Sequence, residues 1–354
     1  MNISIQKISE ENVKVKPDEN KLGFGQYFSD HMLTMTYKDG AWQKGAIKPY
    51  GNFSIDPASM VLHYGQAIFE GLKAYRGKDE QIYLFRPKDN LARFNRSATR
   101  MCMPEIDIDE VYAGIRTLLE LEQDWVPSSK GATLYIRPTM IATEAALGVR
   151  PANEYIFFVI LSPVGAYYPE GFNPVKIFVT DKYVRAVRGG VGEAKTAGNY
   201  AASIMAAIEA QKQGYTQVLW LDDSDRKSIE EVGTMNIFFV INDVIITPPL
   251  SGSFLPGITR DSVLKITREW GLNVVERNIT IENVMAASKD GSLKEVFGAG
   301  TAAIISPVGS LHYKNQEIVV NGGETGALSQ KLFDDLQAIQ FGYKEDKNGW
   351  VDVL

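Results

Sequence analysis

Apolar and polar residues along this chain form short blocks that predict both strands and helices. Residues 82–87, I-Y-L-F-R-P, are rich in aromatic and β-branched side chains and stop at a proline, as strands often do. Residues 89–101 follow with helical character, and Asp89 is placed to cap that helix with its carboxylate. A second helix is predicted over 109–121, where apolar residues recur at helical spacing.

The same mixture continues to the C-terminus. A-T-L-Y-I-R-P and Y-I-F-F-V-I-L predict two strands, and further strands are expected over 217–222, 236–241 and 244–249. The last long element places Leu328, Leu332, Leu336 and Ile339 on one helical face. Because strands and helices mix throughout, we expect a mixed α/β (α+β) fold.

One segment has the composition of a linker. Residues 162–174, S-P-V-G-A-Y-Y-P-E-G-F-N-P, hold three prolines and two glycines. A chain of 354 residues is also long enough for two domains. We therefore predict a smaller N-terminal α/β domain over 1–165, an interdomain linker over 166–174 and a larger C-terminal α/β domain over 175–354.

Composition narrows the class of protein. Hydrophobic residues make up 45% and charged residues 23% of the chain, as in globular proteins with a full core. The net charge of -6 argues against nucleic-acid binding, and no apolar run approaches the ~20 residues that span a membrane. The N-terminus lacks the apolar core of a signal peptide. We expect a cytoplasmic protein that contacts neither nucleic acid nor membrane.

The number and positions of the cysteine and histidine residues argue against a disulfide and against a metal site. The only cysteine, Cys102, rules out an intramolecular disulfide, and its apolar neighbours predict a buried, inert thiol. The three histidines, His31, His63 and His312, lie far apart in the sequence and outside any metal-binding motif. No metal site is expected.

Lys195 is the first candidate for chemistry, in R-G-G-V-G-E-A-K-T-A-G-N-Y (188–200). A lysine that attacks a carbonyl must be partly dehydrated, so that its amine is often neutral. The four glycines of this stretch permit backbone torsions and close approaches that other residues forbid. A solvated lysine in an ordinary Gly-rich turn is the alternative, and the stretch by itself favours that alternative.

Two segments are candidates for binding a phosphate. In S-F-L-P-G-I-T-R-D-S-V-L (253–264), Pro-Gly precedes a predicted helix whose first amides belong to Ile258 and Thr259, and exposed amides at a helix start attract anions. F-G-A-G-T-A-A (297–303) ends a strand in a glycine-rich loop that contains a threonine hydroxyl. Helix starts of this kind are also common without any ligand.

Two adjacent acids precede a strand that is predicted to be buried. Glu230 is expected to face solvent, whereas Glu231 at the mouth of the strand needs a cationic partner. A protonated ring nitrogen of a cofactor is one such partner. Elsewhere, Tyr64, Phe69, Tyr135 and Arg137 fit either an aromatic pocket with one cation or ordinary core packing.

Together these segments resemble the branched-chain amino acid aminotransferases, pyridoxal-phosphate (PLP) enzymes of fold type IV. The resemblance runs from about residue 24 to the C-terminal helix. Its motifs, in order, are F-G-Q-Y-F-S-D-H-M-L, L-H-Y-G-Q-A-I-F-E-G-L-K-A-Y, L-Y-I-R-P, V-G-A-Y, G-G-V-G-x-x-K-x-x-G-N-Y, E-V-G-T-M-N-I-F, L-P-G-I-T-R and E-V-F-G-A-G-T-A. So many ordered motifs exclude coincidence.

The resemblance implies a role for individual residues. Lys195 matches the lysine that forms a Schiff base with PLP and then carries a proton between the substrate and the cofactor. Tyr200 matches the tyrosine at the phenolic oxygen of the cofactor, and Glu231 the acid that faces the pyridine nitrogen. The remaining cofactor-binding positions are Arg93, Arg185, Thr234, Ile258, Thr259 and Thr301.

The resemblance also implies a substrate pocket and a homodimer. The pocket positions are Phe24, Tyr64, Phe69, Tyr135, Arg137, Tyr167, Thr234 and Ala302, with Leu147 and Val149 reaching the pocket of the second subunit. Aromatic walls suit leucine, isoleucine and valine, and Arg137 suits the second carboxylate of 2-oxoglutarate. Some eukaryotic members carry C-x-x-C where this chain has Ala303 and Ser306, so thiol control there is not expected.

The expected activity is thus transamination of L-leucine, L-isoleucine and L-valine with 2-oxoglutarate. A D-amino acid aminotransferase or an aminodeoxychorismate lyase on the same fold is the nearest alternative. A protein of another class, which binds a phosphate ligand at Gly257–Thr259 without covalent chemistry, is the second.

Overall fold

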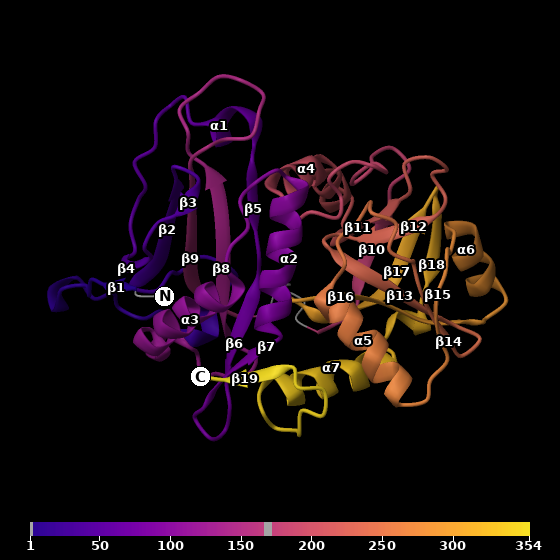
Figure 1. Ribbon diagram of the computed structural model, residues 1–354. Helices are drawn as coiled ribbons and strands as arrows, with labels where there is room; N and C mark the ends of the chain where they lie inside the picture. Colours follow the sequence, from indigo (N-terminus) through magenta and orange to yellow (C-terminus); the bar gives the residue numbers. More distant parts are fainter. Residues whose placement is uncertain (1–2, 166–171) are drawn as a thin grey trace. The chain divides into compact units, whose positions relative to one another are not determined.

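The computed structural model describes residues 3–165 and 172–354. The chain divides into two compact units, which are treated separately below (Figure 1). Unit 1 comprises residues 1–167, 194–197 and 337–354, and unit 2 comprises residues 168–193 and 198–336. The short segment that carries Lys195 therefore belongs to unit 1 although both of its neighbouring segments belong to unit 2. Most of the predicted linker lies outside the described residues, so the domain boundaries stay a prediction.

Unit 1 is built on a ten-stranded sheet in which most neighbours are antiparallel. Its strand order is β1-β4-β2-β9-β8-β6-β7-β19, with β3 beside β2 and β5 beside β8. The strands are β1 Ser4–Ile5, β2 His31–Lys38, β3 Ala41–Trp42, β4 Ala46–Pro49, β5 Ala67–Phe69, β6 Leu72–Arg76, β7 Ile82–Phe85, β8 Thr133–Ala142, β9 Tyr155–Val164 and β19 Val351–Val353.

The helices of unit 1 pack on this sheet and build its core. They are α1 Met60–Tyr64, α2 Pro87–Arg100 and α3 Ile108–Leu121, with short 3-10 turns at Glu10–Asn12, Glu19–Lys21 and Gln123–Trp125. Leu91, Phe94 and Ile115 are fully buried against strand residues such as Phe157, whose ring meets that of Phe94 edge-on at 5.5 Å. Burial of these side chains is the main favourable term for the unit.

The predicted capping role of Asp89 is wrong. Helix α2 begins two residues earlier, with Pro87 in its first turn and Arg86 at the N-cap in a left-handed conformation. Proline at this position needs no donor, so it starts the helix before Asp89. The Asp89 carboxylate instead forms an ion pair with Arg86 at 2.6 Å. The second helix agrees with its prediction and is capped by Asp107.

Unit 2 contains a nine-stranded sheet of mixed direction. Its order is β12-β11-β10-β17-β16-β13-β14-β15, with β18 beside β17 and a further pairing of β12 with β13. The strands are β10 Val175–Val179, β11 Gln217–Leu221, β12 Ile229–Val232, β13 Met235–Ile241, β14 Val244–Thr247, β15 Val274–Glu276, β16 Leu293–Gly300, β17 Ile304–Tyr313 and β18 Gln316–Val319. The central strands β13, β16 and β17 are almost continuously buried, and Phe238 stacks on Phe297 at 5.1 Å.

Helices α4 Ala197–Lys212, α5 Ile258–Glu269 and α6 Ile281–Lys289 accompany this sheet, with a 3-10 turn at Asn321–Gly323. Helix α7, Ala327–Gln340, begins in unit 2 and ends in unit 1. Both units combine sheets with helices, which confirms the predicted mixed α/β fold. In the part of the chain that the structure describes, no helix has the length and apolar character needed to cross a membrane.

Candidate active site

Lys195 is fixed in unit 1 through its main chain. Its amide N–H donates to the hydroxyl of Ser97 at 2.9 Å, and its carbonyl accepts from the amide of Phe69 at 3.0 Å. The next residue, Thr196, donates its hydroxyl to the carbonyl of Ala67 at 2.8 Å. These bonds attach the lysine segment to strand β5 and to helix α2. The side chain of Lys195 is half-buried, so it is neither fully exposed nor fully enclosed.

The structure brings four predicted pocket residues of unit 1 together with Lys195. The Lys195 amine lies 5.1 Å from the centre of the Phe69 ring, and the Arg137 guanidinium lies 4.6 Å from that same centre. Arg137 also donates to the Tyr135 hydroxyl at 3.3 Å, and Phe24 meets the Tyr135 ring edge-on at 5.0 Å. The cluster therefore combines aromatic rings with Arg137, the one cation that the sequence placed there, and adds the Lys195 amine beside Phe69.

The Tyr135 side chain depends on a neighbouring glycine. A Cβ atom on Gly71 would lie 1.8 Å from the Tyr135 hydroxyl oxygen. Only a residue without a side chain leaves room for the phenol there.

Lys73 is paired with Tyr135 across strands β6 and β8, and burial lowers the pKa of Lys73 to about 8. The sequence reasoning assigned no role to Lys73, although it lies in the quoted G-L-K-A-Y motif.

Arg93 is a buried cation on helix α2, not a surface residue. Its Nε and one terminal nitrogen bind the two carboxylate oxygens of Glu70 at 2.7 and 2.9 Å. Both side chains are buried, so the pair is held in a fixed bidentate geometry. Glu70 lies beside Phe69 in the F-E-G motif, and its pairing with Arg93 was not foreseen.

Glu231 lies in unit 2 on strand β12 and has the cationic partner that its burial demands. Its Oε2 is 2.6 Å from Nε of Arg185, and both side chains are almost fully buried. Asn236 donates to Oε1 of Glu231 at 3.3 Å and to the carbonyl of Leu255 at 3.1 Å. The structure thus joins two predicted cofactor residues directly, and it ties them to the segment that precedes helix α5.

Helix α5 begins at the residue that the sequence predicted. The N-cap is Gly257, which provides no side chain to occupy the amides of the first turn, and Ile258 and Thr259 are the first helical residues. A Cβ atom at Gly257 would lie 2.0 Å from Oδ1 of Asn236. The helix start is therefore pressed against the same asparagine that contacts Glu231.

The remaining predicted residues lie at the following places. Tyr200 is half-buried on α4, Thr234 is exposed in the turn between β12 and β13, and Thr301 and Ala302 form the turn after β16. Tyr64 ends α1 and is 41% exposed, and Leu147 and Val149 are 70% and 89% exposed. Tyr167 lies outside the described residues.

The glycines on either side of Lys195 act in different ways. Gly189 adopts φ +74°, a left-handed conformation that glycine accepts readily, while a Cβ atom at Gly192 would lie 2.0 Å from the carbonyl oxygen of Ser253. Gly198 has open space around its Cα within the described residues. The predicted need for glycine therefore applies to Gly189, to Gly192 and to Gly190, where a Cβ atom would lie 2.8 Å from the carbonyl oxygen of Val187, and it receives no support at Gly198.

The prediction that Glu230 faces solvent is wrong. Strand β12 is buried over its whole length, and Glu230 is only 3% exposed. Neighbouring strand residues point to opposite faces, and here neither face is open to water. Desolvation, with the nearby carboxylates of Asp222 and Glu231, raises the pKa of Glu230 to about 7 against the opposing effects of Ser253 and Arg185.

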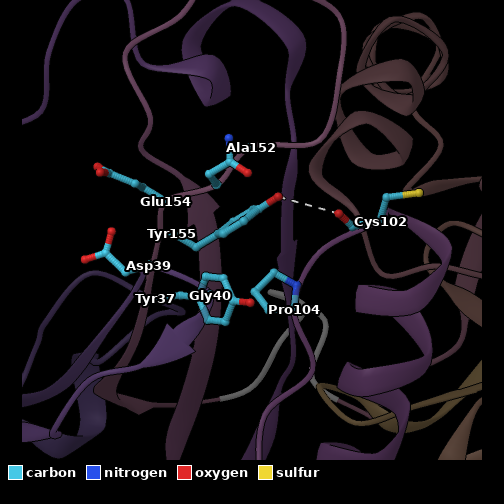
Figure 2. A pocket seen from close by; sticks show the side chains of 9 residues that line it. Tyr37, Asp39, Gly40, Cys102, Pro104, Ala152, Glu154 and Tyr155 are labelled. Atoms are coloured by element: carbon cyan, nitrogen blue, oxygen red, sulfur yellow. Dashed lines mark hydrogen bonds between the residues drawn. The ribbon is translucent and has the colours of Figure 1, made fainter.

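A separate pocket lies in unit 1, and its lining includes none of the predicted site residues. Its volume is about 460 Å³, and it is lined by Tyr37, Asp39, Gly40, Cys102, Pro104, Ala152, Asn153, Glu154 and Tyr155 (Figure 2). The predicted burial of Cys102 is wrong, because the residue is exposed in a left-handed turn after α2. Figure 2 shows its sulfur turned away from Tyr155, whose hydroxyl binds the Cys102 carbonyl at 3.5 Å.

Comparison with known proteins gives a consistent result. The family model described as amino-transferase class IV matches residues 67–311. The chain is 52% identical over 339 residues to branched-chain-amino-acid aminotransferase 2 of Bacillus subtilis (strain 168), an alignment that covers 96% of this chain and 93% of that protein.

Two solved structures of branched-chain amino acid aminotransferases have a similar fold. The enzyme from Escherichia coli has a TM-score of 0.73 and 28% identity, and the match covers 90% of this chain and 98% of the other. A T.th. enzyme complexed with N-(5'-phosphopyridoxyl)-L-glutamate has a TM-score of 0.72 and 26% identity, and that match covers 90% of this chain and 97% of the other.

Proposed function

The chain belongs to the family of class IV aminotransferases, and we propose that it transfers the amino group of L-leucine, L-isoleucine and L-valine to 2-oxoglutarate with PLP as cofactor. The observation that carries this proposal is the 52% identity to a branched-chain aminotransferase along 96% of the chain. The adduct of the cofactor with L-glutamate in a solved relative supports glutamate as the second amino acid.

The residues of unit 1 fit the covalent part of the reaction. Bound PLP supplies an electron sink for the carbanion that forms when the substrate Cα loses its proton. Lys195 is anchored through its main chain on both sides, so its amine can change partners without moving the backbone. We assign to its Nζ the attachment of the cofactor and the transfer of the Cα proton.

Residues of unit 2 are suited to bind the pyridine ring and the phosphate group of PLP. The buried Glu231 carboxylate, held by Arg185, is suited to accept a hydrogen bond from a protonated pyridine nitrogen. The glycine-capped start of α5 offers amides to a phosphate, with the hydroxyls of Thr259 and Thr301 as further donors. From unit 1, Arg93 is proposed to add a cation whose orientation Glu70 fixes. Tyr200 at the phenolic oxygen and Thr234 complete the proposed set.

The aromatic cluster of unit 1 suits both halves of the reaction. Phe24, Phe69 and Tyr135 offer apolar area to a branched side chain, whereas Arg137 offers a cation to the distal carboxylate of 2-oxoglutarate. Tyr64, Ala302 and Tyr167 are proposed as further pocket residues. One site can in this way accept an apolar and an acidic substrate in turn.

We propose a homodimer and a cytoplasmic location as well. Main-chain bonds between Met60 and Glu144 and between Ala146 and Ala58 hold α1 beside the segment that precedes Leu147. The two segments expose four large apolar or aromatic side chains: Leu62, Tyr64, Leu147 and Val149. Exposed apolar groups gathered on neighbouring segments are typical of an interface. A second copy of the chain is the proposed partner.

Covalent trapping tests the cofactor assignment. The purified protein, loaded with PLP, is reduced with borohydride and digested, and the peptides are examined by mass spectrometry. We expect the cofactor mass on the peptide that contains Lys195, and none after Lys195→Ala. Protein that stays colourless with added PLP and carries no such mass would favour a non-covalent phosphate-binding protein instead.

A further inference from the structure

Glu230 is a buried carboxylate that the reaction outlined above does not use. It precedes Glu231 on strand β12 and is 3% exposed. Burying a carboxylate is costly unless it is paired, so a residue in this position needs a structural or chemical reason. Its contacts lead directly to the predicted site.

A chain of contacts connects Glu230 to Glu231 through a loop. The Ser253 hydroxyl donates to Oε1 of Glu230, and the Ser251 hydroxyl lies 2.7 Å from that of Ser253. The carbonyl of Ser253 accepts from Nη1 of Arg185 at 3.1 Å. Arg185 in turn holds Glu231 through Nε at 2.6 Å. The contacts therefore lead from Glu230 through Ser253 and Arg185 to Glu231, and each one restricts the position of the next residue.

The loop that contains Ser253 has little room to move. Gly192 approaches the Ser253 carbonyl so closely that a Cβ atom at Gly192 would lie 2.0 Å from the carbonyl oxygen. The carbonyl of Gly192 also accepts from Nη1 of Arg185, at 3.3 Å. Ser253 is fully buried. The position of Arg185 is therefore set by two carbonyls, and Glu230 holds the residue that provides one of them.

The charges around Glu230 agree with a role beyond packing. The charges of Asp222, Glu231 and Arg185 all act on Glu230, and Arg188 forms an ion pair with Asp222 at 2.9 Å. The second oxygen of Glu230, Oε2, has no hydrogen-bond partner among the described residues. Burial of the Glu230 carboxylate away from water is the main cause of its raised pKa.

We propose that Glu230 is a positioning residue of the aminotransferase: through Ser253 it fixes Arg185, and through Arg185 it aims the Glu231 carboxylate at the cofactor ring. This inference rests on the proposed role of Glu231 at the pyridine nitrogen. It adds a residue, and the Ser251–Ser253 loop, to the machinery that holds the cofactor.

The test measures cofactor binding and not turnover. The variants are Glu230→Ala, Glu230→Gln and Ser253→Ala, with Glu295→Ala as the matched control. Glu295 is another buried carboxylate of unit 2, but it binds Ser329 and the amide of Leu328. For each apo-protein, the dissociation constant for PLP is measured by titration, the absorption spectrum of bound PLP is recorded, and the thermal unfolding temperature is determined.

We expect Glu230→Ala and Ser253→Ala to weaken PLP binding about tenfold, the equivalent of one well-placed hydrogen bond to a charged group, and to shift the absorption band. Glu230→Gln keeps an oxygen facing Ser253, so it should bind PLP nearly as the wild type does. Glu295→Ala should lower the unfolding temperature while leaving the affinity and the spectrum unchanged.

The inference is overturned if Glu230→Ala and Ser253→Ala bind PLP with wild-type affinity and spectrum, whatever their stability. It is equally overturned if Glu295→Ala changes the affinity and spectrum as much as they do. The wild type is measured first, because failure of the wild type to bind PLP at all would contradict the proposed function itself. The two failures are thereby distinguished.

Discussion

At the scale of single residues, the Lys195 side chain should be needed for the reaction but not for the stability of the fold. Its backbone bonds to Ser97 and Phe69 do not involve its side chain, which is half-buried. Lys195→Ala should therefore abolish transamination while changing the free energy of unfolding by less than about 1 kcal/mol. Turnover with L-leucine and thermal unfolding are measured together. Lys212→Ala, an exposed lysine at the end of α4, is the control and should keep full turnover.

Glu230 gives a pH prediction. Its pKa is raised from about 4.5 to about 7 in the folded protein, mainly by desolvation. Below the unfolded value both states carry the proton, so burial has no cost. As pH rises toward 7 the unfolded state loses the proton first, and the folded state is destabilised in comparison. Above about pH 7 the carboxylate is ionised in both the folded and the unfolded state, and the destabilisation has reached its full size.

Glu230→Gln removes this titration. The stability of the variant minus that of the wild type should increase between pH 5 and pH 8, measured by chemical denaturation with saturating PLP. The comparison cancels the titration of groups remote from Glu230, while the charges of Asp222, Glu231, Arg185 and Arg188, which interact with Glu230, form part of the measured difference. A difference that stays constant over this range would contradict the raised pKa.

At this scale the sequence indicated candidate residues for the site but not their surroundings. Through their resemblance to a known family, the motifs marked Lys195, Glu231 and Arg93 as candidates, and their roles stay predictions. They did not reveal that Glu70 binds Arg93 or that Glu230 is buried. Those facts depend on which segments cover each face of a sheet, and no local pattern encodes that.

At the scale of elements, the start of α5 should depend on Gly257. An added methyl group would lie 2.0 Å from Oδ1 of Asn236, so either Asn236 or the helix must move. Gly257→Ala should weaken PLP binding by about tenfold or more, since displaced amides lose their alignment with the phosphate. Gly51→Ala, where the space is open, is the control for the substitution itself. Equal affinities of the two variants for PLP would argue against this phosphate site.

Local patterns predicted most of the strands and helices that have clear periodicity. The strands over 82–87, 217–222 and 236–241 and the last helix agree with the structure within a few residues. Long-range pairing was not predictable: β19 at Val351–Val353 joins the edge of the first sheet beside β7. The partner of an edge strand is decided by tertiary packing, so sequence distance carries no signal for it.

At the scale of the whole molecule, the proposed dimer can be tested at the exposed apolar residues of unit 1. A double change, Leu147→Asp with Val149→Asp, puts two charges on the proposed interface. Burying unpaired charges is unfavourable, so the protein should sediment as a monomer at concentrations where the wild type is a dimer. Val15→Asp, at another highly exposed apolar residue, should leave the dimer intact. An unchanged sedimentation profile of the double variant would contradict the assigned interface.

The central claim is the activity, and a substrate panel with 2-oxoglutarate as acceptor tests it most directly. Purified, PLP-loaded protein is given L-leucine, L-isoleucine, L-valine, D-alanine or aminodeoxychorismate, and the formation of glutamate or pyruvate is followed. The account predicts glutamate from each of the three branched-chain amino acids and no turnover of the other two compounds. Turnover of D-alanine or aminodeoxychorismate with none of L-leucine would contradict it.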